Sequence, residues 1–365
     1  ILHLMEDLGI QSANIGLPGA GPRAYNDTLE LAKEIAHSNM KIMPNCAART
    51  VIADIDPVID ISQKAGIPIE VATFVGSSPI RQYVEGWTVD TVLKLTEDAV
   101  KYVVAHNLPS MYVTEDTTRA HPDDIEKLYT AAVDCGATRV VIADTVGHCT
   151  RTGALNLVRF VKDVIENTGE DVKIDWHGHN DRGFALASAL AAIRAGVDRV
   201  HGCALGIGER CGNTSMDLLL VNLKMWRIID NDLSKLNEYC RLVSEATHVP
   251  IPFNYPVIGP DAFRTATGVH AAAVIKAINT GDNSLADMVY SGVPAHMVGR
   301  KQKIEIGPLS GVSNVLFWLK EHGYEQYNGV ANHIFDYAKH SNKILTNDEI
   351  ETFIETELVK PEHHR

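Results

Sequence analysis

The feature that most constrains the fold is a regular alternation of short apolar runs with amphipathic helical segments. Strands separated by helices favour a parallel sheet with right-handed crossovers. Apolar residues nearly fill each run, as expected for strands buried on both faces. The seven runs that we expect to be strands are residues 11–17, 41–47, 67–76, 109–115, 138–145, 171–178 and 198–206.

This order of elements predicts an α/β protein with a (β/α)₈ TIM barrel. A barrel needs eight strands, and the chain opens on a helical segment, ILHLMEDLGI, so we expect the first strand to precede Ile1. The alternative is an open doubly wound sheet. No G-x-G-x-x-G follows any of the runs, which favours the barrel.

Charge and composition exclude several classes of partner. The net charge of −13 argues against nucleic acid and against an anionic membrane surface. No apolar run reaches the roughly 20 residues of a membrane span. The six cysteines are scattered without paired spacing, as in a reduced cytoplasmic enzyme. We therefore expect a cytoplasmic protein that acts on small molecules.

The most informative motif is the pair His177 and His179, which follows the run VKIDW. Side chains at i and i+2 of a strand share one face, so both imidazoles point the same way at the end of the strand. Imidazoles with open positions beside them are typical of a catalytic site for a first-row metal. A pair of ordinary polar residues is the alternative for the tripeptide alone.

Polar residues also mark the ends of the other expected strands, where TIM barrels carry their chemistry. Each one taken singly could be a cap or a loop anchor. Together they indicate one functional rim, formed by Asn14, Asn45, Arg49, Thr73, Thr114, Glu115, Asp116, Asp144, Thr145, Glu209, Arg210 and Asn213.

Four segments carry a resemblance to a known family. They are HGHNDRG with GIGERCGN (177–183 and 206–213), ADTVG (143–147), DAFRTATGVHAAAV (261–274) and the run from Tyr290 to Val315. The chain resembles the acyl-CoA-dependent condensing enzymes 2-isopropylmalate synthase, homocitrate synthase and citramalate synthase. These share a metal-binding barrel with the lyases that cleave hydroxymethylglutaryl-CoA.

The resemblance implies a role for individual residues. It makes His177, His179 and Asn213 ligands of a divalent cation (Zn, Mn or Mg), and it makes acetyl-CoA the co-substrate. Thr145 would receive the carboxylate of the 2-oxo acid. The acid-base pair at the thioester would be Glu115 and His270, with Tyr290 nearby.

Two departures from the family pattern concern the first strands. The Arg-Asp pair that supplies a third metal ligand in the family is absent from the start of this chain. The next strand ends Asn-Ile-Gly-Leu-Pro (14–18) where the family has Glu-x-Gly-Phe-Pro. We expect the side chain of the 2-oxo acid to contact Asn14, Asn45 and Thr73, among apolar neighbours that favour 2-oxoisovalerate before pyruvate.

We expect three parts: a catalytic barrel at 1–245, a linker with the His270 segment at 246–300, and a small helical subdomain at 301–365. No regulatory domain is expected. The Pro-rich linker PIPFNYP favours extended backbone, so we predict a homodimer in which His270 reaches the partner's barrel.

The leading hypothesis is an acyltransferase that forms 2-isopropylmalate in leucine biosynthesis. Homocitrate and citramalate synthase are close alternatives. A retro-aldol lyase on the same barrel is a second class, although GIGERCGN and the His270 segment favour the synthases. A non-catalytic metal-binding paralogue is a third, because of the absent Arg-Asp pair.

Overall fold

The computed structural model describes residues 1–324 and 329–359. These residues form two compact units. Unit 1 comprises residues 1–231 and 239–249, and unit 2 comprises residues 232–238 together with the chain from Pro250 onward. The three-part division expected from the sequence stays a prediction.

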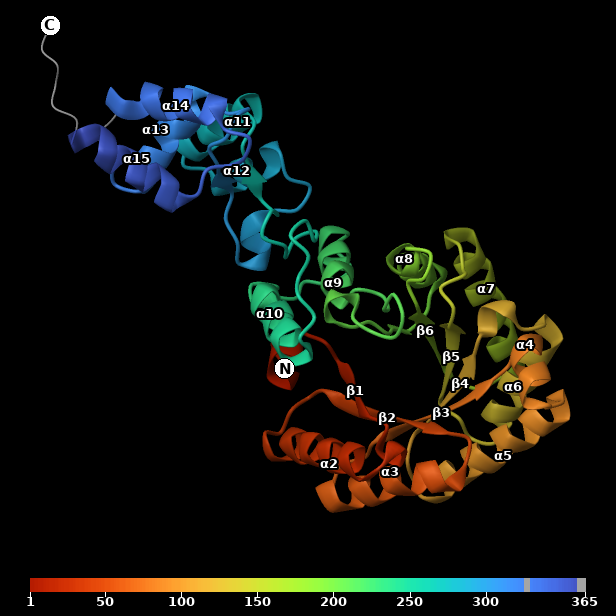
Figure 1. The fold of residues 1–365 in the computed structure, drawn as a ribbon. Helices are drawn as coiled ribbons and strands as arrows, with labels where there is room; N and C mark the ends of the chain where they lie inside the picture. The colour runs from red at the N-terminus through yellow and green to blue at the C-terminus, as the bar shows by residue number, and fades with distance from the viewer. Residues whose placement is uncertain (325–328, 360–365) are drawn as a thin grey trace, which may run out of the picture. The chain divides into compact units, whose positions relative to one another are not determined.

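Unit 1 is built on one curled sheet of seven parallel strands in sequential order (Figure 1). Each strand is hydrogen-bonded to the next along the chain, and β1 and β7 form the two edges. The parallel α/β architecture expected from the sequence is therefore confirmed. The strands are β1 (Ser12–Gly16), β2 (Met43–Arg49), β3 (Glu70–Gly76), β4 (Ser110–Glu115), β5 (Arg139–Asp144), β6 (Lys173–Gly178) and β7 (Arg199–Val200).

Helices connect the strands and cover the outer, convex side of the sheet (Figure 1). Their ends follow ordinary capping chemistry. The Thr150 side chain accepts the Gly153 N–H at the start of α7, and Gly169 at φ 77° ends that helix. The helices are α1 (Leu2–Asp7), α2 (Pro22–His37), α3 (Ile52–Ala65), α4 (Pro79–Glu85), α5 (Val89–Ala105), α6 (Pro122–Asp134), α7 (Arg151–Thr168), α8 (Ala185–Ala195), α9 (Met216–Met225) and α10 (Leu236–Thr247).

Alternation along the strands decides which side chains face the interior of the curled sheet. Ala72, Met111 and Val141 cluster on the inner face, whereas Val75 and Tyr112 pack in the outer core against the helices. Residues two apart share a face. The inner face of β4 is thus Met111, Val113 and Glu115, and its outer face carries Tyr112 and Thr114.

A buried network of charges ties the early residues of four strands together. Arg139 on β5 donates to Glu70 on β3 at 3.2 Å and to Asp175 on β6 at 2.5 Å. Arg199 on β7 donates to the same two carboxylates at 2.8 and 2.7 Å. Arg199 also reaches the Ser12 hydroxyl on β1 at 3.2 Å, so it links the two edges of the sheet.

The last strand is shorter than expected. The sequence predicted a strand over 198–206, but β7 is two residues long. After His201 the chain turns away from β6. Cys203 then forms a bridge with Ser215, and His179 forms one with Asn213. The Gly-rich turn of residues 206–213 (GIGERCGN) therefore occupies the place where the expected strand would continue.

Unit 2 is mainly helical and contains the short parallel pair β8 (Arg264–Thr265) and β9 (Lys303–Ile304). Val315, Leu319, Ile334 and Ile354 belong to its core. The sequence predicts a helical region at the C-terminal end of the chain, and the described part of that region is helical, as expected. Its helices are α11 (Gly268–Asn279), α12 (Asn283–Val289), α13 (Val312–Glu321), α14 (Ala331–His340) and α15 (Asn347–Val359). In the described parts of both units, no helix is long and apolar enough to cross a membrane.

The charge network generates a stability prediction. Arg139→Met should lower the free energy of unfolding by about 3–5 kcal/mol, because removal of one partner leaves buried charge unpaired. Lys101→Met is the matched control, since Lys101 forms an exposed pair with Glu97 and its loss should change little. Urea denaturation measures both. Equal effects of the two substitutions would contradict a structural role for the network.

Candidate metal and substrate site

Two imidazoles lie together at the C-terminal end of β6. His177 and His179 sit on the inner face, as strand alternation requires, and their Nε2 atoms are 3.3 Å apart. Burial, with His201 and His179 nearby, lowers the pKa of His177 to about 3. Burial and the Arg210 guanidinium also lower the pKa of His179. Both rings are therefore neutral near pH 7, the state in which imidazole binds a metal.

The Gly-rich turn places Asn213 beside His179. The two residues form an antiparallel bridge. Gly212 has φ 86°, and a Cβ there would lie 1.9 Å from the Gly206 carbonyl oxygen, so only glycine fits. The Asn213 amide N–H₂ donates to the Ile207 carbonyl at 3.4 Å and lies 3.7 Å from Cys203 Sγ. Its Oδ1 is buried and has no hydrogen-bond partner.

These groups fit a divalent cation. Two neutral imidazoles supply nitrogen ligands, and the unpartnered Asn213 Oδ1 is a buried acceptor that lacks a donor. Within the described ranges, no three His, Cys, Asp or Glu side chains form a metal-holding group. The candidate ligands are thus two histidines and an amide oxygen. Convergence of all three on one cation stays a prediction.

Glu115 ends β4 on the inner face. Burial raises the pKa of this carboxyl, whereas the Arg81 guanidinium, 3.8 Å away, acts in the opposite direction. Nearby Asp116 and Glu209 raise the pKa further. A carboxyl with a raised pKa is a stronger base than an ordinary glutamate, which suits it to general acid–base catalysis.

Thr145 follows β5, and its hydroxyl accepts the Asp116 N–H at 2.8 Å. Arg210, which also pairs with Asp181, donates to the Thr145 carbonyl at 2.7 Å. The Thr145 hydroxyl therefore keeps its own proton for a further acceptor.

Two of the residues expected at the rim, near the substrate, lie elsewhere in the structure. Asn45 faces inward but lies early in β2, in register with Glu70, and donates to the Ser12 hydroxyl at 3.1 Å. It belongs to the level of the charge network and not to the rim. Thr73 lies on the outer face of β3, fully buried toward the helices, with no partner for its hydroxyl. Both expectations of rim position are wrong.

Asn14 lies on the inner face of β1, two residues before the strand ends, and accepts the Gly16 N–H at 3.1 Å. In unit 2, His270 is on α11 and its ring lies against Tyr290, with centroids 4.2 Å apart. The roles expected for Asn14, His270 and Tyr290 remain proposals.

Sequence reasoning missed His201, the third histidine on the inner face. Its Nε2 is 2.9 Å from Asp175 Oδ2, and its ring centroid is 5.6 Å from that of His177. The signal was present, because His201 is two residues after Arg199 and so shares its face.

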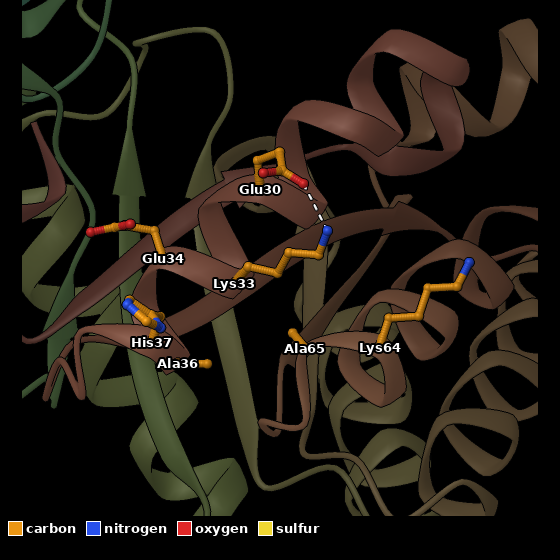
Figure 2. A pocket seen from close by; sticks show the side chains of 7 residues that line it. All are labelled: Glu30, Lys33, Glu34, Ala36, His37, Lys64 and Ala65. Atoms are coloured by element: carbon orange, nitrogen blue, oxygen red, sulfur yellow. Dashed lines mark hydrogen bonds and ion pairs between the residues drawn. The ribbon is translucent and has the colours of Figure 1, made fainter.

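A surface hollow of about 550 Å³ lies away from this chemistry (Figure 2). It is formed near the C-terminal ends of α2 and α3, shortly before β2 and β3 begin, which is the opposite end of the strands from His177. Most of the residues that line it are charged, and they form ion pairs, such as Lys33 with Glu30. The lining residues are Glu30, Lys33, Glu34, Ala36, His37, Lys64 and Ala65.

Comparison with known proteins assigns the family. The family model described as HMGL-like matches residues 1–243. The chain belongs to the HMGL-like family. It is 30% identical to homocitrate synthase AksA of Methanopyrus kandleri over 93% of this chain and 80% of that protein. It is 30% identical to 2-isopropylmalate synthase of Methanocaldococcus jannaschii over 91% of this chain and 60% of that protein.

A third relative, 2-isopropylmalate synthase of Sulfolobus acidocaldarius, is 29% identical over 94% of this chain and 86% of its own length. The resemblance seen in the motifs is therefore confirmed, and the expectation of an enzyme of the acyltransferase type is confirmed with it.

Solved structures agree on the fold. The HMG-CoA lyase of Bacillus subtilis superposes with a TM-score of 0.57 at 17% identity, over 69% of this chain and 87% of that one. The lyase of Pseudomonas aeruginosa gives 0.54 at 16% identity, over 68% and 85%. At such identities the likeness shows the TIM-barrel fold alone.

The raised pKa of Glu115 predicts a pH-dependent stability. A carboxyl whose folded pKa lies above its unfolded value destabilises the fold increasingly as pH rises through that folded pKa, and has no such effect below the unfolded value. Glu115→Gln should therefore raise the melting temperature at neutral pH, and the gain should disappear toward pH 4.

Asp54→Asn is the control of opposite sign. Hydrogen bonds from Arg49 lower the pKa of Asp54, so this variant should lose stability at neutral pH and recover as pH falls. Melting curves between pH 4 and pH 8 test both. A Glu115→Gln variant that is less stable than the parent at pH 7 would refute the electrostatic account.

Proposed function

We propose that this protein catalyses a metal-dependent condensation of acetyl-CoA with a 2-oxo acid. The first candidate is 2-oxoisovalerate, which gives 2-isopropylmalate in leucine biosynthesis. One observation carries the proposal. Two neutral imidazoles and an unpartnered amide oxygen lie at the strand ends of a chain whose relatives are named 2-isopropylmalate and homocitrate synthases.

His177, His179 and Asn213 would hold the divalent cation, whether Zn, Mn or Mg. When bound, such a cation polarises a ketone and stabilises the alkoxide that forms from it. The residues themselves orient the site. The backbone bridge between His179 and Asn213 fixes their spacing, and the bonds made by the Asn213 amide leave its Oδ1 available.

The other residues divide the remaining tasks. The Thr145 hydroxyl donates a hydrogen bond to the carboxylate of the 2-oxo acid. Glu115, with its raised pKa, exchanges a proton with the methyl group of acetyl-CoA. His270, beside Tyr290, is the second acid-base group.

The interior favours an apolar side chain on the substrate. Ala72, Val113, Val141 and Met111 line the inner face below the rim. A second carboxylate would need a cation, because an unpaired buried charge is costly. Arg49 is already held by Asp54 through bonds of 2.6 and 2.8 Å.

Homocitrate synthase is the second candidate, and one observation favours it. Arg81 stands next to Glu115, and its buried Nε has no hydrogen-bond partner. This guanidinium, which also pairs with Glu85 at 3.1 Å, is a cation beside Glu115 that would meet a second carboxylate.

An assay of 2-oxoisovalerate, pyruvate and 2-oxoglutarate with acetyl-CoA, read as released thiol, tests the proposal. We expect kcat/KM to be highest for 2-oxoisovalerate, with pyruvate behind by about 1–3 kcal/mol per missing methylene. Preference for 2-oxoglutarate would contradict the apolar-pocket argument, and Arg81→Leu would then abolish that preference. Cleavage of hydroxymethylglutaryl-CoA without condensation would assign a lyase.

We further propose a homodimer in which unit 2 of one chain completes the site of its partner. Around His270, unit 2 exposes Val269, Met288 and Tyr290 by 76, 59 and 51%. In unit 1, the rim helix α4 has no buried residue. Exposed apolar faces of this kind mark protein contacts, and a two-fold pair is the commonest way to cover them.

Subunit complementation tests this arrangement. His270→Ala should lower kcat by about 10²–10⁴, as for a lost general base, and His179→Ala should be inactive. When equal amounts of the two variants are unfolded and refolded together, about half of the dimers should be mixed. Each mixed dimer has one intact site of two, so about a quarter of the parent activity should return. Absence of restored activity would place His270 in the site of its own chain.

A further inference from the structure

The loop after β4 is bonded to the end of β5 at three consecutive residues. The Asp116 N–H donates to the Thr145 hydroxyl at 2.8 Å. The Thr117 hydroxyl accepts the Ala143 N–H at 2.9 Å, and the Thr118 hydroxyl donates to Asp144 at 3.1 Å. Such a row of contacts fixes the two strand ends relative to each other.

Asp116 has a strained backbone within this loop. Its φ of 60° and ψ of 36° are left-handed, which is uncommon for a residue other than glycine, and its side chain is 1% exposed. Such a conformation persists only where the surroundings impose it. Arg119 does so, because its Nε and Nη2 donate to the Asp116 carboxylate at 2.8, 3.0 and 2.6 Å.

The left-handed turn has consequences on both sides. It follows Glu115 directly, so it fixes the path of the chain where β4 ends at that residue. It also aims the Asp116 N–H at Thr145, whose hydroxyl acts as acceptor and must send its own proton elsewhere. The ion pair between Asp116 and Arg119 thus holds the end of β4 in a fixed position relative to Thr145 at the end of β5.

We propose that Asp116 and Arg119 are positioning residues that couple the acid-base group Glu115 to the substrate-binding hydroxyl of Thr145. This inference rests on the proposed function, which assigns Glu115 and Thr145 to the two halves of the reaction. Neither Asp116 nor Arg119 needs to contact a substrate. Their effect is on the orientation of the two groups that do.

A double-mutant cycle between Arg119→Gln and Thr145→Val tests the coupling. The measurements are the Kd of the 2-oxo acid by calorimetry and kcat/KM with acetyl-CoA. Arg119→Gln should weaken 2-oxo acid binding and lower kcat together. Because Arg119 acts on the Kd through Thr145, its effect on the Kd should shrink by about fivefold or more once Thr145 is valine.

Arg119→Lys keeps the charge but not the two-pronged contact, so it should recover only part of the loss, and it replaces Arg119→Gln in the cycle if that variant does not fold. Arg159→Gln, an exposed position on α7, is the matched control and should leave both constants unchanged. A merely structural role would lower the melting temperature without this coupling.

Multiplicative effects of the two substitutions, in an enzyme whose parent form is active, would overturn the coupling and leave the proposed function intact. A parent enzyme that releases no thiol with any 2-oxo acid would instead overturn the proposed function.

Discussion

The site depends on the buried ion pairs that join Glu70, Arg139, Asp175 and Arg199. Two acids and two arginines alternate on the inner face of the sheet, so each carboxylate has two cationic partners. Charges removed from water are tolerated only when paired in this way. The pairing fixes the relative height of β3, β5, β6 and β7, and therefore the level at which their later residues emerge.

The inner face is arranged in layers above this network. Small apolar side chains such as Ala72 and Val141 follow it, and the polar rim comes next. Asp175 connects the first layer to the last, because it holds His201, whose ring lies beside that of His177. A structural charge network is in this way continuous with the metal site.

The sequence predicts the alternation of strands and helices, the histidine pair and the family. It does not predict which face of β2 or β3 a polar residue occupies. Those strands are buried on both sides, so apolar residues fill both faces and no alternation is visible. Thr73 was therefore placed on the wrong face, and Asn45 was placed at the end of a strand that continues for four more residues.

Other features depend on tertiary contacts that leave no local pattern. The left-handed Asp116 is held by an ion pair and by a hydroxyl on another strand. The amide of Asn213 is oriented by Ile207 within a turn whose shape depends on Gly206 and Gly212. Spacing in the sequence names these residues but not their orientation.

We propose that His177, His179 and Asn213 together hold one divalent cation. Calorimetric titration of the metal-stripped protein with Co²⁺, followed by the visible spectrum of the bound ion, tests it most directly. We expect about one equivalent of Co²⁺ to bind. Binding should be lost in His179→Ala, weakened in Asn213→Ala and unchanged in His148→Ala, which alters an exposed histidine nearby. Retention of the parent affinity and spectrum in His179→Ala would show that His179 is not a ligand of the cation.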